Sequence, residues 1–117
     1  MDTRKSHDWI MPRKIDTGLP ADLQFAIDAF GSAARVQLIR DLQRRGPASI
    51  PTLAGRLDLN EHTVRANLRA LEVAGVVKGD IPPELRGSTA VTYRAQRSRC
   101  AELLMILRTN ILLLPSD

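Results

Sequence analysis

The sequence predicts a mainly α-helical fold with a small β-hairpin, and three observations lead to that prediction. Apolar residues recur at helical spacing in four segments, and a C-terminal segment is apolar all round. Alternating residues from Thr89 to Arg94 follow a turn-rich segment, which is typical of the second strand of a hairpin. Between these features, the run from Ile50 to Val77 combines two short helices, a tight turn and the start of a strand. This is the layout of a winged helix-turn-helix domain.

The two central helices are specified by their turn as well as by their apolar residues. Asp58 can adopt the left-handed conformation that the turn needs, with slight strain. Asn60 can cap the second helix with its side-chain oxygen, and Glu61 adds a carboxylate to the first turn. Each helix offers an apolar stripe to a shared core, formed by Leu53, Ala54 and Leu57 in the first and by Val64, Leu68 and Leu71 in the second.

Two further helices are expected before this pair, after an arm over residues 1–20 that we expect to be flexible and solvated. Asp22 is placed to help cap the first of them. Ser32 is placed to cap the second, which should run to about Arg45 and end at Gly46. The residues expected to face the core are Leu23, Ala26, Ile27 and Phe30, followed by Val36, Ile39 and Leu42.

A β-hairpin wing is predicted after the second central helix. Gly75 can end that helix in a left-handed conformation, and Val76 and Val77 open a strand. The polar loop GDIPPELRGS contains a proline pair that removes backbone donors, so the hairpin cannot stay regular to its tip. The returning strand should place alternate residues on opposite faces, with Val91 and Tyr93 on one and Ala90 and Thr92 on the other.

The outward-facing residues predict double-stranded DNA as a partner. Opposite Val64, the second central helix presents two arginines, which form paired hydrogen bonds with guanine edges and phosphates. The wing, with Arg86 at its tip, is expected to reach phosphates or a minor groove. A solvated helix face is the alternative. The predicted DNA-binding residues are Asn60, His62, Thr63, Arg65, Ala66, Arg69, Lys78, Arg86, Ser88 and Thr89.

The charge distribution agrees with a nucleic-acid partner. Fourteen of the 17 basic residues are arginine, whose forked guanidinium suits phosphate and guanine. The formal net charge is +4, and the basic excess lies within residues 35–108 rather than residues 1–34.

The last predicted helix indicates a second copy of the chain. Ser98 can cap this helix, and apolar residues occur on all of its faces. A domain this small cannot bury every face of such a helix against its own core. The expected organisation is an arm (1–20), a winged helix-turn-helix domain (21–97) and an additional C-terminal dimerisation helix (98–114). A helix wrapped wholly onto its own protomer is the alternative. The predicted dimer-interface residues are Leu103, Leu104, Leu107, Ile111 and Leu114.

The segment from Ala33 to Tyr93 resembles the ArsR/SmtB family of winged-helix repressors through the stretches AARVQLIRDL, SIPTLAGRLDLNEHTVRANLRALEVAGVV and VTYRA. The resemblance implies a dimer that represses its operon until an effector releases it from DNA. MarR-like and other winged-helix groups share this core.

The metal ligands of that family are not matched here. Where relatives carry a cysteine-valine-cysteine run, this chain has Ser49, Ile50 and Pro51, and its two histidines lie away from the last helix. Arg65 and Asn67 replace the usual serine and histidine, so the operator of relatives cannot be transferred. We expect a non-metal-sensing member with no metal site and no cofactor.

The remaining titratable groups suggest no catalysis. The lone Cys100 fits a reducing cytoplasm, and a buried packing role is favoured over redox sensing assisted by Arg97 and Arg99. Lone acids such as Asp41 and Glu72 are expected to be solvated surface groups. No signal peptide, membrane span, phosphate loop or nucleophile–base pair is recognised, so an enzyme is not expected.

These observations predict a cytoplasmic, homodimeric, sequence-specific DNA-binding repressor that reads an inverted repeat. Two alternatives stay open. One is a winged-helix module that binds another protein, and the other is a regulator that responds to an unidentified small, non-metal effector.

Overall fold

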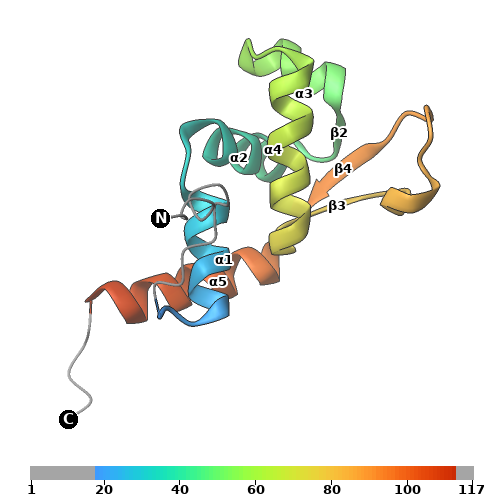
Figure 1. Ribbon diagram of the computed structural model, residues 1–117. Helices are drawn as coiled ribbons and strands as arrows, with labels where there is room; N and C mark the ends of the chain where they lie inside the picture. The colour runs from blue at the N-terminus through green and yellow to red at the C-terminus, as the bar shows by residue number, and fades with distance from the viewer. Residues whose placement is uncertain (1–17, 113–117) are drawn as a thin grey trace, which may run out of the picture.

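The computed structural model describes residues 18–112 and shows helices gathered on one side with a β-hairpin projecting from them (Figure 1). The predicted residues 1–17 of the arm and Leu114 lie outside the described residues. The order of elements is α1 (Ala21–Phe30), α2 (Ala33–Arg45), β2 (Ala48–Ser49), α3 (Ile50–Leu57), α4 (Glu61–Ala74), β3 (Val77–Gly79), a 3-10 turn η2 (Pro83–Leu85), β4 (Thr92–Ala95) and α5 (Arg97–Leu112).

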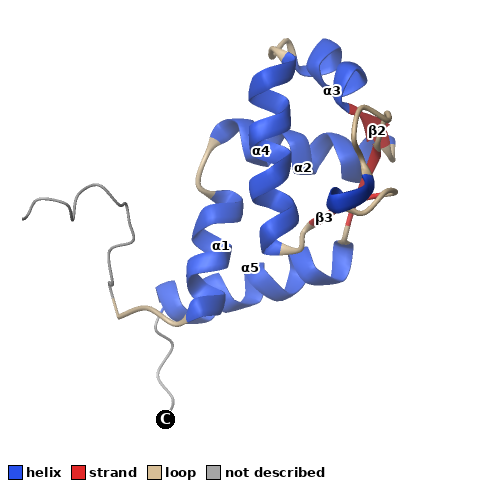
Figure 2. Ribbon diagram, turned by 45° about the vertical axis from the view of Figure 1, so that its right-hand side comes forward, coloured by secondary structure: helices blue, strands red, loops and turns tan. Residues whose placement is uncertain are grey.

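Helix α4 lies at the centre of the packing, in contact with α1, α2, α3 and β3. The whole predicted stripe of Val64, Leu68 and Leu71 is inaccessible to solvent. Figure 2 shows α1 and α4 standing side by side, while α5 runs across beneath them. The core therefore places one face of α4 inside the domain and leaves its opposite face open.

Four of the predicted local signals at the helix ends are confirmed, at Ser32, Asp58, Asn60 and Gly75. The Ser32 and Asn60 side chains accept hydrogen bonds from the amides of Arg35 and Thr63, at 3.1 and 2.7 Å. Asp58 has φ 54° and ψ 47°, a left-handed conformation that aspartate tolerates better than most residues. Gly75 ends α4 with φ 84°.

The wing contains one strand more than the sequence predicts. The three-stranded antiparallel sheet has the order β2-β4-β3, with β2 paired to β4 through Ala48 opposite Tyr93. The returning strand begins at Thr92 rather than Thr89, because the loop turns through η2 first. The predicted alternation is confirmed, since Val91 and Tyr93 are buried.

Two residues that were predicted to face the core, Ile27 and Val36, lie on the exposed side of their helices. Val36 and Ile27 are each 37% exposed, whereas Leu38 and Ala29 fill the core in their helices. Asp41 is only 7% exposed because the α3 residue Arg56 forms a 3.0 Å ion pair with it, so it is not a solvated acid.

Two predicted caps are also wrong. Pro20 is the N-cap of α1, and Asp22 lies inside the first turn without a capping hydrogen bond. Helix α5 begins at Arg97, so Ser98 is already helical. None of the helices within residues 18–112 is both long enough and apolar enough for a membrane span.

The Asn60 cap should contribute measurably to stability. Asn60→Ala removes the acceptor for the Thr63 amide and should lower the free energy of unfolding by about 1 kcal/mol in urea titrations. Gln37→Ala, at an exposed position inside α2, is the control and should change stability by less than about 0.5 kcal/mol. Equal stability of Asn60→Ala and the wild type would show that this cap is dispensable.

Candidate nucleic-acid interface

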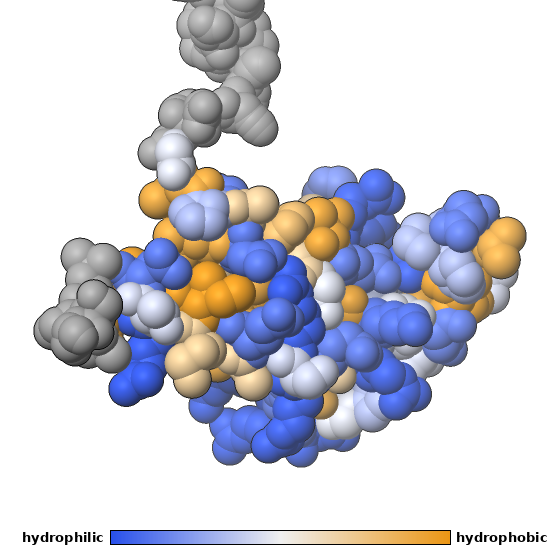
Figure 3. All heavy atoms as spheres, turned by 90° about the horizontal axis from the view of Figure 1, so that it is seen from below, coloured by the Kyte–Doolittle hydropathy of each residue, from blue (hydrophilic) through white to orange (hydrophobic). Residues whose placement is uncertain are grey.

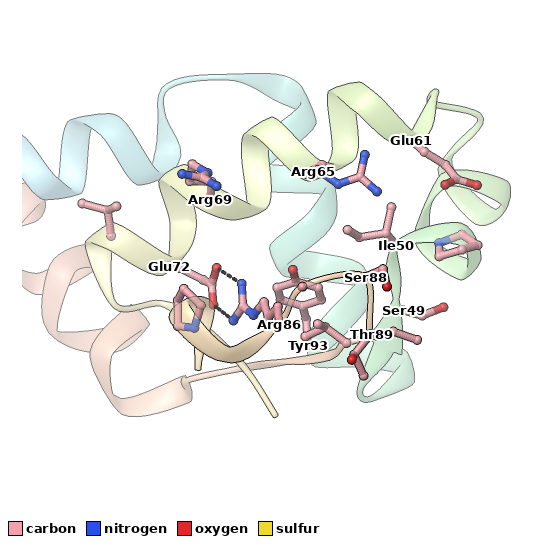
Figure 4. Close-up of a pocket in the computed structure, with 16 residues that line it drawn as sticks. Ser49, Ile50, Glu61, Arg65, Arg69, Glu72, Arg86, Ser88, Thr89 and Tyr93 are labelled. Carbon is pink, nitrogen blue, oxygen red and sulfur yellow. Dashed lines mark hydrogen bonds and ion pairs between the residues drawn. The ribbon is translucent and has the colours of Figure 1, made fainter. Parts of the chain in front are cut away.

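A groove of about 680 Å³ separates the outer face of α4 from the wing. Arg65 and Arg69 line it from α4, while Ser88 and Thr89 line it from the wing (Figure 4). Ser49 extends the lining at the start of α3. The groove thus joins residues from three segments that are distant in the sequence.

The outer face of α4 carries the side chains that the helical spacing predicted to point away from the core. His62, Arg65, Ala66 and Arg69 are exposed, as expected from their position opposite the buried stripe. Thr63 is half-buried, and the side-chain oxygen of Asn60 accepts the capping hydrogen bond. The groove lining includes Arg65 and Arg69 but not His62, Ala66, Thr63 or Asn60, which lie elsewhere on or before α4.

Position 67 has a structural role. The Asn67 side chain accepts a 3.0 Å hydrogen bond from Arg35 Nε and donates one to the Thr63 carbonyl at 2.8 Å. Arg35 also donates to the Asp28 carbonyl at 2.5 Å. These contacts connect α4 to α2 and to the end of α1, so they hold α4 in place.

Arg86 lies in the wing loop, but its side chain does not point outward. Its side chain turns back toward α4, where Nη1 and Nη2 donate to the two carboxylate oxygens of Glu72 at 3.0 and 2.5 Å. Arg86 Nε donates to the Ile81 carbonyl at 2.7 Å, and the guanidinium carbon lies 5.4 Å from the Tyr93 ring centroid. The hydrogen bond to Glu72 raises the pKa of Arg86, and burial raises the pKa of Tyr93. Glu72 is therefore a paired acid rather than a solvated one.

Lys78, Ser88 and Thr89 remain exposed on the wing. The sheet register also shows a cation that the sequence prediction missed, because Arg94 lies directly opposite Lys78 on neighbouring strands. Like charges in this position repel each other, and neither cation has an ion pair within residues 18–112. Extending the predicted alternation by two residues puts Arg94 on the same side as Ala90 and Thr92, but the pairing with Lys78 depends on the register.

The predicted dimer residues divide into two groups. Leu103 is fully buried in the protomer, so its assignment to the dimer interface is wrong, and Leu107 is half-buried against the same core. Leu104 and Ile111 are 50% and 64% exposed, with Met105 and Leu112 exposed beside them. Figure 3 shows apolar residues gathered on this underside of the molecule.

No cluster of three or more potential metal ligands occurs among the described residues. Cys100 is buried, and burial raises the pKa of its thiol. The neighbouring Arg99 is engaged elsewhere, donating to the Ala74 carbonyl at 3.0 Å and pairing with Glu102 at 2.9 Å. The arrangement favours the packing role for Cys100.

Of the comparisons with known proteins, only the one with solved structures bears on the fold. A family model described as HVO_A0114 matches residues 32–86, just under half of the chain. A comparison with curated protein sequences gave no match.

Several solved structures are similar to this chain. The homodimeric winged helix-turn-helix DNA-binding domain Mb0332 from Mycobacterium bovis, a possible ArsR-family regulator, is 20% identical with a TM-score of 0.60, covering 89% of this chain and 94% of that one. HlyU from Vibrio cholerae is 19% identical with a TM-score of 0.56, covering 80% and 96%. The transcriptional repressor BigR from Xylella fastidiosa is 20% identical with a TM-score of 0.52, covering 83% and 87%. The fold is therefore that of winged helix-turn-helix proteins.

The raised thiol pKa leads to a reactivity prediction. At pH 8 Cys100 should be mainly in the thiol form and shielded, so iodoacetamide should alkylate the native protein far more slowly than the chain unfolded in guanidinium chloride. Free glutathione at the same pH provides the reference rate. Native alkylation as fast as in denaturant would mean that Cys100 is accessible.

Proposed function

We propose that this chain is a homodimeric, sequence-specific DNA-binding transcriptional regulator that acts as a repressor. The observation that carries the proposal is the convergence of Arg65 and Arg69 with wing hydroxyls around one open groove. The similar fold of Mb0332, described as a homodimeric DNA-binding domain, and of the repressor BigR supports it.

Helix α4 is the proposed reader of the major groove. Its exposed face carries His62, Arg65, Ala66 and Arg69, and its buried face fixes their direction. Arg65 lies nearer the N-terminus of α4, the part that enters the groove more deeply in this motif, so we assign it to a base edge. Thr63 and the backbone near Asn60 flank that contact.

The wing is the proposed source of phosphate contacts. Ser88 and Thr89 offer hydroxyl donors across the groove from α4, and Lys78 on β3 and Arg94 on β4 add two charges. A DNA phosphate would relieve the repulsion between these paired cations. Such contacts determine affinity and register, while base contacts determine the sequence that is read.

A second copy of the chain is the proposed occupant of the apolar underside. Leu104 and Ile111 lie on one side of α5, seven residues apart, and remain exposed in the protomer. A twofold dimer on this face would present two α4 helices to half-sites about 34 Å apart, which predicts an inverted repeat. Occupancy of such a site over a promoter would repress transcription.

The contribution of Arg65 to base recognition can be tested with DNA selected from a random pool. Arg65→Ala should weaken binding to the selected site by about 1–3 kcal/mol and relax the preference at one base position, as measured by fluorescence anisotropy. Arg44→Ala removes an equally exposed arginine outside the groove and is the control. Unchanged affinity and specificity of Arg65→Ala would contradict the reading role of α4 and favour a module that binds protein instead.

The dimer can be tested by placing charge on the apolar face. Leu104→Glu combined with Ile111→Glu should give a folded monomer by sedimentation, because a twofold dimer interface would have to bury two unpaired carboxylates from each protomer. Leu85→Glu changes a comparably exposed apolar residue on the wing and should leave the dimer intact. A wild-type monomer at micromolar concentration would refute the proposed interface.

A further inference from the structure

One ion pair connects the wing loop to α4. Within residues 18–112, the two hydrogen bonds between Arg86 and Glu72 are the only ones that join loop 80–91 to α4. Both side chains are 16% exposed, so water screens their interaction less than that of a surface pair. The contact is bidentate, which makes it stronger and more directional than a single hydrogen bond between neutral groups.

The surroundings of Arg86 fit this one arrangement. Its Nε bonds to the Ile81 carbonyl while its guanidinium lies over the Tyr93 ring, so it contacts the loop and β4 as well as α4. Because Gly79 has no side chain, the Arg86 guanidinium can lie against its backbone. A Cβ there would collide with Arg86 Nη2 and lie 2.8 Å from Val91 Cγ1.

The same pair neutralises one of the two acids that line the groove, the other being Glu61. Glu72 lines the groove one turn beyond Arg69, where a free carboxylate would repel a DNA phosphate. Paired with Arg86 it contributes no net charge. The pair therefore lets the loop approach α4 without adding a repulsive group to the surface that carries Arg65 and Arg69.

We propose that Glu72 and Arg86 form a wing latch, a pair of positioning residues that holds the wing at the distance from α4 that DNA binding requires. The latch rests on the proposed DNA-binding function and deepens it, because it assigns Arg86 to the geometry of the groove instead of to a phosphate. When the latch is open, the loop samples other positions, and the binding-competent fraction of the protein falls.

The latch and a direct phosphate contact predict opposite effects for one substitution. If Arg86 served a phosphate, Glu72→Gln would free it and strengthen binding, while Arg86→Gln would weaken binding and lower the salt slope by about one. If the pair is a latch, both substitutions break the same contact. Each should then weaken DNA binding about five- to thirty-fold with the salt slope unchanged. Arg86→Gln should be the weaker binder of the two, because it leaves the Glu72 carboxylate unpaired in the groove.

The experiment measures anisotropy at several salt concentrations for wild type, Glu72→Gln, Arg86→Gln and the double variant. Because both single substitutions break the same ion pair, the double variant should bind DNA no more weakly than either single variant. Glu84→Gln and Arg44→Gln are the matched controls, since each neutralises an exposed residue outside both the latch and the groove lining. Circular dichroism checks that every variant folds. Gly79→Ala supplies a second route to an open latch that leaves both charges in place.

A readout without DNA completes the test. Amide hydrogen exchange in loop 80–91 should accelerate in both single variants while the amides of α4 stay protected. Tighter or unchanged binding by Glu72→Gln, a lowered salt slope for Arg86→Gln, or unchanged exchange in the loop would overturn the latch. A wild-type protein that binds no duplex would overturn the proposed function instead, so the two failures are distinguishable.

Discussion

The fold depends on α4 burying one face completely while leaving the other open. Val64, Leu68 and Leu71 are removed from solvent, and each such burial contributes about 1.5–3 kcal/mol. Because α4 packs on α1, α2, α3 and β3, its rotation about its own axis is fixed. The outward direction of Arg65 and Arg69 is therefore a consequence of the core.

Local interactions are what the sequence predicts best. Asp58, Asn60 and Gly75 each act within a few residues of their own position, so capping and turn rules were sufficient to place them. The phase of α2 was harder, since Val36 fits a helical stripe with Ile39 and Leu38 fits one with Leu42. The choice between them depends on neighbouring helices, as does the burial of Asp41, whose partner Arg56 lies on α3.

The candidate site shows the same division. The exposed face of α4 follows from spacing alone, because its buried stripe is unambiguous. The conformation of the wing does not, since η2 turns Arg86 toward a carboxylate fourteen residues earlier in the chain. Nothing in the local pattern marks Glu72 as its partner, and the role of Gly79 is visible only once Arg86 crosses it.

The two proposed interfaces are separate in this protomer but mechanically connected. Leu104 and Ile111 are absent from the groove lining, so a partner on the underside would leave Arg65 and Arg69 uncovered. Arg99 connects the regions, because it donates from α5 to the Ala74 carbonyl in the last turn of α4 and lies 3.7 Å from Asp22 of α1. In the proposed dimer, contact with the partner would fix the position of α5. The hydrogen bond from Arg99 to the Ala74 carbonyl would then restrict the position of α4 as well. The distance between the two reading helices would then be determined by the protomer's own packing as much as by the interface.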